Sequence, residues 1–216
     1  MPELSDFRLG ADVVANDGNR VGTLVSVIVD ETGFEPRSLV VKDAATPAGR
    51  LLADEKLLTT DEVVIPITAV VSATHDLVRL SMSEPDVRRQ PLYLSYRPKP
   101  MTVEEAVVED AEILTGGIGL PQEEEFANKP AGEIEIDRDE NVMLGTTGRR
   151  LGRVQDVLFD HGELIGVVIR PDGFFKRDVV LPIRFIERAD DMALFAQLDE
   201  SEIENLKPFI DAQPGS

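Results

Sequence analysis

The chain has 216 residues, no cysteine and a net charge of -19. Without cysteine it has no disulfides, thiolate metal ligands or cysteine nucleophiles. The negative charge argues against nucleic acid or an anionic membrane as a partner, because Lys and Arg must neutralise phosphates at both. The acidic N-terminus has no signal-peptide core, and no apolar run approaches the roughly 18 residues that span a bilayer. We therefore expect a cytoplasmic protein without membrane insertion.

One short sequence motif occurs twice in the chain. Residues 17–22 read Asp-Gly-Asn-Arg-Val-Gly and residues 147–152 read Thr-Gly-Arg-Arg-Leu-Gly, and an aliphatic run ending in Asp follows each. With one offset of 130, the matching landmarks are Gly18 with Gly148, Gly22 with Gly152, and Asp30 with Asp160. A later match, of Pro66 with Pro182, needs an offset of 116, so the first copy carries 14 extra residues, which we place around 43–60. Such internal repetition predicts two similar domains.

In the first copy, alternating and aliphatic runs predict strands over residues 7–14, 21–30, 38–42, 62–66, 67–72 and 77–82. Asp17-Gly18 supplies the positive φ angles of a tight hairpin turn. Pro66 has no N–H to donate to a ladder, so it predicts a corner or an edge.

The second copy predicts strands over residues 141–144, 151–160, 163–170, 178–182, 184–189 and 193–198. Each copy thus has about six short strands with Gly, Asp and Pro at the bends, which is typical of a small barrel. We predict an all-β fold of two small β-barrels in tandem.

The rest of the chain predicts a linker and a tail. We divide the chain into a first barrel domain (1–84), a Pro-rich acidic linker (85–133), a second barrel domain (134–198) and a C-terminal helix with its tail (199–216). Thr102 and Glu105 form a capping box that predicts a short helix in the linker, and Asp199 and Glu202 predict a helix reaching Ala212. Between residues 104 and 140 there are 13 acidic and 2 basic residues, more than half of the net charge.

The paired glycines, the aliphatic strand ending in Asp and the later Val/Leu-Ile/Leu-Pro-Ile resemble the PRC-barrel family. This small β-barrel is seen in the cytoplasmic domain of the photosynthetic reaction-centre H subunit and in the ribosome-maturation protein RimM. The resemblance covers residues 7–82 and 137–198, but neither relative is matched over its full length. It implies a scaffold or protein-docking module and carries no family-wide catalytic residues.

Few residues are candidates for chemistry. His75 and His161, the only histidines, fall in expected turns at non-equivalent places, so we expect no shared metal site. Asp30 and Asp160 could bind a cation, but a carboxylate at a strand end more often accepts backbone N–H bonds in the following turn. The adjacent aromatics Phe174 and Phe175, with Arg177 near them, predict either packing between the barrels or an anchor for a protein partner.

The sequence therefore favours a non-enzymatic docking protein whose acidic linker contacts another protein, with a basic partner favoured by charge. We expect the two barrels to pack with pseudo-twofold symmetry, the linker and the C-terminal helix covering their junction. The alternative is a small-ligand or metal-ion binding protein that uses a cleft between the barrels, lined by Asp30, Asp160 and linker carboxylates. We expect no cofactor and no catalytic residues, and the oligomeric state stays open.

Overall fold

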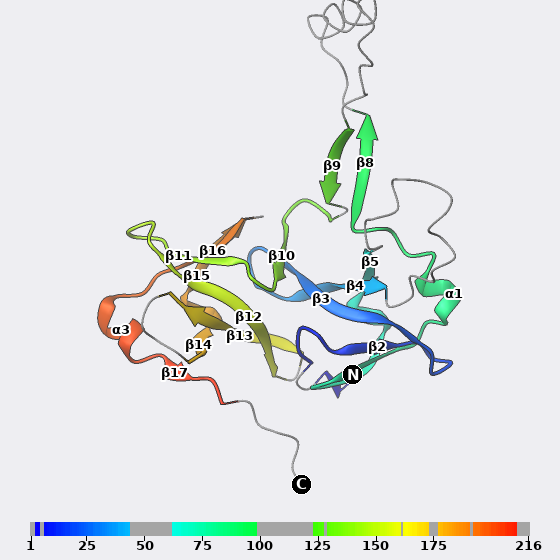
Figure 1. The fold of residues 1–216 in the computed structure, drawn as a ribbon, viewed down its shortest axis with the longest axis horizontal. Helices are drawn as coiled ribbons and strands as arrows, with labels where there is room; N and C mark the ends of the chain where they lie inside the picture. The colour runs from blue at the N-terminus through cyan, green and yellow to red at the C-terminus, as the bar shows by residue number, and fades with distance from the viewer. Residues whose placement is uncertain are drawn as a thin grey trace, which may run out of the picture.

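The computed structural model describes residues 3–4, 7–43, 62–98, 123–127, 129–160, 162–172, 177–190 and 192–210. Strands dominate these residues, and they form two large sheets and one two-stranded ribbon (Figure 1). The fold is all-β, as the sequence predicts. The expected linker helix and the 14-residue excess lie largely outside the described residues.

The first barrel has strands β1 (Glu3–Leu4), β2 (Asp12–Val14), β3 (Arg20–Asp30), β4 (Pro36–Asp43), β5 (Glu62–Pro66), β6 (Val70–Thr74) and β7 (Leu77–Leu80). They are ordered β1-β6-β7-β2-β3-β4-β5. The long strand β3 pairs with β2 near its start and with β10 (Glu133–Asp137) near its end, so the sheet receives a strand from the far side of the linker.

The second sheet repeats the first with strands β11 (Asn141–Leu144), β12 (Arg150–Asp160), β13 (Glu163–Pro171), β14 (Val179–Pro182), β15 (Ile186–Asp190), β16 (Ala193–Ala196) and β17 (Lys207–Pro208). Their order is β15-β16-β11-β12-β13-β14-β17. The ribbon consists of β8 (Leu94–Pro98) and β9 (Glu123–Ala127), which pair antiparallel and stand away from the barrels (Figure 1).

Most expected strands are confirmed to within two residues, and the strands expected over 7–14 and 67–72 are wrong in extent. The strand expected over 7–14 is only β2, because Gly10 turns the chain at φ 97° and donates its N–H to Leu24 O. Residues 67–69 and 183–185 form 3-10 turns, η1 (Ile67–Ala69) and η2 (Ile183–Phe185), directly after the prolines. Pro66 and Pro182 therefore do mark equivalent corners.

The C-terminal helix is also shorter than expected. It is α3 (Glu200–Glu204), and the predicted capping box of Asp199 and Glu202 is present. The helix ends there because Pro208 cannot continue it and the Lys207–Pro208 segment pairs with β14 instead. Figure 1 places α3 at the end of the second barrel away from the first, so it does not cover the junction.

The duplication extends further than the sequence landmarks. The first repeat also ends in a short helix, α1 (Glu84–Val87), which is 116 residues before the start of α3. Pro91 to Tyr93 then runs along β5, with a bridge from Leu92 to Val63, just as β17 runs along β14. Each barrel thus covers the free edge of an equivalent strand with its own C-terminal segment.

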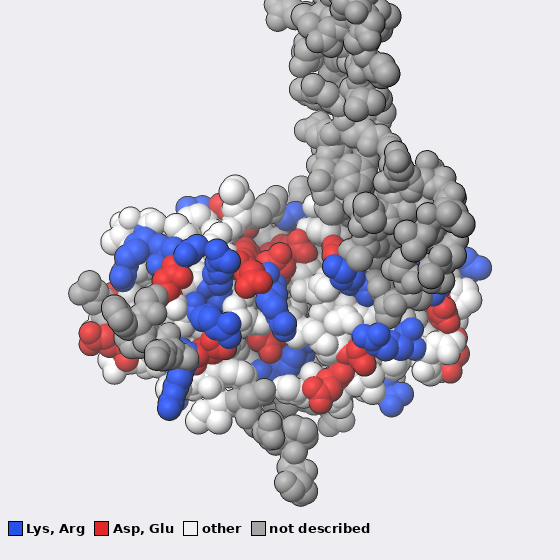
Figure 2. All heavy atoms as spheres, viewed as in Figure 1, with Lys and Arg blue, Asp and Glu red and all other residues white. Residues whose placement is uncertain are grey.

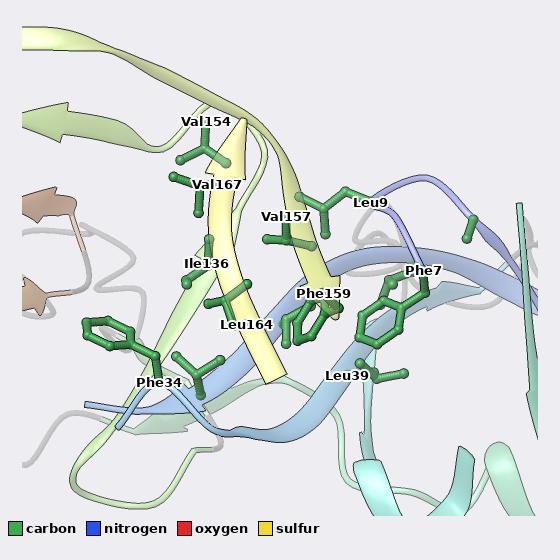
Figure 3. Packing of buried hydrophobic residues seen from close by; sticks show 14 of the residues in the cluster. Phe7, Leu9, Phe34, Leu39, Ile136, Val154, Val157, Phe159, Leu164 and Val167 are labelled. Carbon is green, nitrogen blue, oxygen red and sulfur yellow. The ribbon is translucent and has the colours of Figure 1, made fainter. Parts of the chain in front are cut away.

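The two barrels exchange segments at their junction. β10 lies antiparallel to β3, with Ile136 opposite Val27 and Ile134 opposite Val29, and both isoleucines are buried. In return, the segment before β2 reaches the second barrel, where the Phe7 ring stacks on Phe159 with 4.2 Å between centroids (Figure 3). One cluster of buried side chains therefore runs through both barrels. Burying each of these large apolar groups contributes about 1.5–3 kcal/mol.

Candidate functional site

A cleft opens where β10 leaves the first barrel. Its volume is about 330 Å³, and its walls come from β3, β4, β5, the end of β10 with Arg138 after it, and the segment before β2. The polar side chains that line it are Thr23, Ser26, Lys42, Glu62, Glu135, Asp137 and Arg138. The cleft is therefore mostly anionic, with two cationic side chains at its walls.

Glu135 fastens β10 to the first barrel. One carboxylate oxygen accepts a hydrogen bond from the Ser26 hydroxyl and the other accepts one from the Tyr93 hydroxyl. Ser26 and Tyr93 are both buried. A charged acceptor satisfied by two hydroxyls holds the strand more strongly than apolar packing alone.

Carboxylate charges accumulate along the cleft. Burial, together with the charge of Glu135, raises the pKa of Glu62, while Lys42 opposes this change. Desolvation is also the main reason that the pKa of Asp137 is raised to about 6, followed by the charges of Glu135 and Asp139. Asp137 remains exposed at the cleft rim, so solvent screens much of this repulsion.

Glu140 is the most perturbed acid of the group. Both of its carboxylate oxygens are buried, and neither has a hydrogen-bond partner among the residues described. Burial raises its pKa to about 9, helped by the negative charges of Asp137, Glu135 and Asp190. Glu140 therefore holds a proton at neutral pH.

The reciprocal contact on the second barrel is built around Asp156. Its Oδ1 atom accepts the N–H groups of Leu9 and Val157, both at 2.8 Å, and its Oδ2 atom pairs with Arg8 at 3.3 Å. Arg138 donates to Leu9 O at 2.8 Å from the other side. Burial raises the pKa of Asp156 despite these hydrogen bonds. One acid thus anchors each exchanged segment: Glu135 lies on the segment β10 itself, and Asp156 lies on the second barrel.

The residues singled out from the sequence have structural roles where the structure describes them. Asp30 accepts N–H bonds from Thr32, Gly33 and Glu35, and these bonds lower its pKa. Neither Asp30 nor Asp160 is among the residues that line this cleft. His75 lies in the turn before β7, as expected, and contacts Asp76 at 2.8 Å.

The other predicted positions divide into turns and undescribed residues. Gly18 and Gly148 have the positive φ that the turns need, 87° and 67°. Phe174, Phe175 and His161 lie outside the described residues, whereas Arg177 is described and exposed.

The cleft carboxylates were not identified as a site from the sequence. Glu62 and Glu135 stand 73 positions apart and only the pairing of β10 with β3 brings them together. A usable signal was the alternation in Glu133-Ile134-Glu135-Ile136-Asp137, which is the pattern of a half-buried strand. This alternation lies within the acidic segment of residues 104–140, where the many charged residues make a strand pattern hard to recognise.

Figure 2 shows acidic side chains gathered on the face around β10, beside Lys and Arg side chains over the second barrel. In the part of the chain that the structure describes, no three His, Cys, Asp or Glu side chains are arranged to hold a metal ion. The described helices are each too short to cross a bilayer.

Comparisons with known proteins agree with the duplicated architecture. A family model described as the PRC-barrel domain matches residues 5–81 and again residues 138–200, about two thirds of the chain. A search of curated proteins returned no match. The two matched segments contain the strands of the two sheets except β1, β10 and β17. The chain belongs to the PRC-barrel family, with two copies of the domain in tandem.

Proposed function

We propose that this tandem PRC-barrel protein is a non-enzymatic, cytoplasmic docking module that binds a basic protein partner through the acidic segment between its barrels. The observation that carries the proposal is the placement of this charge. Glu123 to Glu125 lie on β9, in a ribbon that stands away from both barrels, and the same segment continues into β10 at the cleft (Figure 1). A projecting, single-sign charge steers an oppositely charged partner toward the surface.

The structure separates the two parts of this acidic segment. Glu135 of β10 anchors that strand to Ser26 and Tyr93 of the first barrel, whereas β9 belongs to a separate two-stranded sheet. We therefore assign binding to the charges of residues 104–125 and leave β10 its structural role. Neutralising the whole segment would confuse loss of binding with loss of folding.

The test compares the full chain with a variant in which the acids of residues 104–125 are changed to Gln or Asn. Proteins captured from the native host by the full chain are identified, purified and titrated against both forms. We expect a basic protein whose affinity falls in the variant and with rising salt. A control variant with exposed barrel acids changed instead, Glu31→Gln, Glu163→Gln and Glu187→Gln, should bind normally. Equal binding by all three forms would contradict the proposal.

The cleft favours a second function, the binding of a small polar ligand. Its volume of about 330 Å³ would hold a metabolite of modest size, and both signs of charge line it. Thermal-shift screening separates the two functions: one metabolite that raises the melting temperature well above buffer effects favours ligand binding. A Glu62→Gln variant should then lose that increase.

A further inference from the structure

A row of exposed arginines crosses the second barrel. Asn141, Arg153 and Arg170 are direct neighbours across β11, β12 and β13. Arg153 and Arg170 are both exposed, and Figure 2 shows Lys and Arg side chains gathered over β12 and β13. Like charges directly opposite each other on neighbouring strands destabilise a sheet. The pair of Arg153 and Arg170 therefore does not contribute to the stability of the barrel.

Among the described residues, Asp178 and Asp139 are the acids whose charges act on Arg170. Arg170 forms a two-pronged ion pair with Asp178, at 2.9 and 3.0 Å, and remains 63% exposed. Arg153 has no ion-pair partner among the residues that the structure describes. The second repeat carries equal numbers of acidic and basic residues. The positive charge of the row therefore comes from the local placement of the arginines and not from an excess of basic residues in this repeat.

The internal duplication shows what covers the same place on the first barrel. The positions equivalent to Arg153 and Arg170 are Thr23 and Lys42, which are also direct neighbours across two strands. Both line the cleft, where the carboxylates of Glu135 and Asp137 on β10 face them. The first barrel therefore has an acidic, extended segment over this face.

On the second barrel, the described residues include no such acidic strand beside the row. Its counterpart of β10 is the segment around Phe7. The strand pairing aligns Asn141 with Asp12, an offset of 129, so the position equivalent to Asp137 is occupied by Arg8. Arg8 already pairs with Asp156 and its guanidinium lies over the Phe209 ring. The exchanged segment thus adds positive charge where, on the first barrel, it adds negative charge.

We propose that the face around Arg153 and Arg170 is a second docking surface, which binds a carboxylate-rich extended segment of a protein partner. Arginine suits this role because its planar guanidinium matches a carboxylate in two-pronged geometry. Two opposed guanidinium groups offer few phosphate contacts, so they fit two carboxylates of an extended strand, as Glu135 and Asp137 supply on the first barrel, better than a nucleic acid. This surface is independent of the acidic one, and failure of either proposal leaves the other standing.

The test is an NMR titration of the full chain with a capped peptide of residues 131–137, the acidic strand that covers the first barrel. We expect shifts confined to β11–β13 and to the Arg153 and Arg170 side chains. Arg153→Gln and Arg170→Gln should each weaken binding about two- to fivefold, the worth of an exposed charge pair. Arg79→Gln removes an exposed arginine from β7 and should change nothing.

Three results would overturn the proposal. One is equal binding of a peptide with Gln and Asn in place of its acids. Another is a shift pattern on β3, which would mean that the peptide replaces β10. The third is displacement of the peptide by inorganic phosphate or a single-stranded oligonucleotide at lower concentrations than the peptide itself needs. Spectra of the variants away from β11–β13 should match the parent, which excludes misfolding as a cause.

Discussion

At the scale of single residues, Glu140 is a buried acid in a place where the other repeat has alanine. The N–H of Val154 donates to Glu140 O just as the N–H of Leu24 donates to Ala11 O, so the two positions are equivalent. Ala11 is 3% exposed, whereas Glu140 buries both carboxyl oxygens without partners. A buried polar group without a hydrogen bond costs free energy, and the first repeat avoids that cost.

We predict that Glu140→Ala stabilises the protein by about 1–3 kcal/mol, the penalty of an unsatisfied buried polar group. Chemical denaturation at pH 7 measures the change. Glu163→Ala, at an exposed position on β13, is the control and should stay within about 0.5 kcal/mol of the parent. A destabilised Glu140→Ala protein would show that the carboxyl group has a partner that supports the fold.

At the scale of elements, one glycine in each repeat permits two strands to approach closely. A Cβ atom on Gly22 would lie 2.3 Å from Lys42 O, and one on Gly152 would lie 2.2 Å from Arg170 O. Gly22 lies beside a bulge in the pairing of β2 with β3, and Gly152 lies beside the equivalent bulge in the pairing of β11 with β12. The repeated sequence motif thus preserves a backbone contact and carries no chemistry of its own.

We predict that Gly22→Ala and Gly152→Ala each destabilise the protein by on the order of 2–4 kcal/mol, because the opposing backbone has to move. Gly33→Ala is the matched control. A Cβ there would lie 3.4 Å from the Asp30 carboxylate, so the cost should stay below about 1 kcal/mol. Denaturant midpoints compare the three variants, and equal midpoints would refute the steric explanation.

The same elements show which structural features could be predicted from the sequence and which could not. The hairpin at Gly18, the corner at Pro66 and the capping box at Asp199 depend on local backbone chemistry, and all three were predicted. β10 was missed as a partner of β3 because its pairing is decided by the packing of two barrels. The cleft carboxylates were missed for the same reason, since contacts between distant segments leave no local signal.

At the scale of the whole molecule, the raised pKa values make stability depend on pH. Asp137 and Glu140, with pKa values of about 6 and about 9 in the folded protein, hold protons that the unfolded chain releases near pH 4. The folded state therefore binds more protons over this range, and stability falls as pH rises through 6 and then 9. Asp30 and Asp199 have lowered pKa values, so their contribution is lost only in more acidic solution.

We predict that the free energy of unfolding decreases by on the order of 5 kcal/mol between pH 5 and pH 9, most of it from Glu140, because solvent screens the exposed Asp137. Denaturation at a series of pH values measures it. Glu140→Gln should flatten the curve over the whole range from pH 5 to pH 9, and Asp137→Asn should flatten it only below about pH 6. A curve that rises toward pH 9 would have the wrong sign for buried carboxylates.

The exchanged segments also make the two barrels one folding unit. The first sheet contains β10, and the second barrel packs Phe159 against Phe7, so each half is incomplete alone. We predict that a protein cut at a protease site inserted between residues 98 and 123 stays together on size exclusion. Its halves should separate only in denaturant, because the shared core is continuous through both barrels.

Two variants of the cut protein decide whether the exchange is the cause. Ile136→Asp places a charge at a fully buried position on β10 opposite Val27, and Phe7→Ala removes the stacked ring from Phe159. Each should let the cut halves dissociate, whereas Ile165→Asp, at a 46% exposed position, should not. If the cut halves part without any substitution, the barrels are independent and the exchanged segments are accessory to their folds. If they hold until β10 or Phe7 is altered, the exchange is what joins two PRC barrels into one molecule.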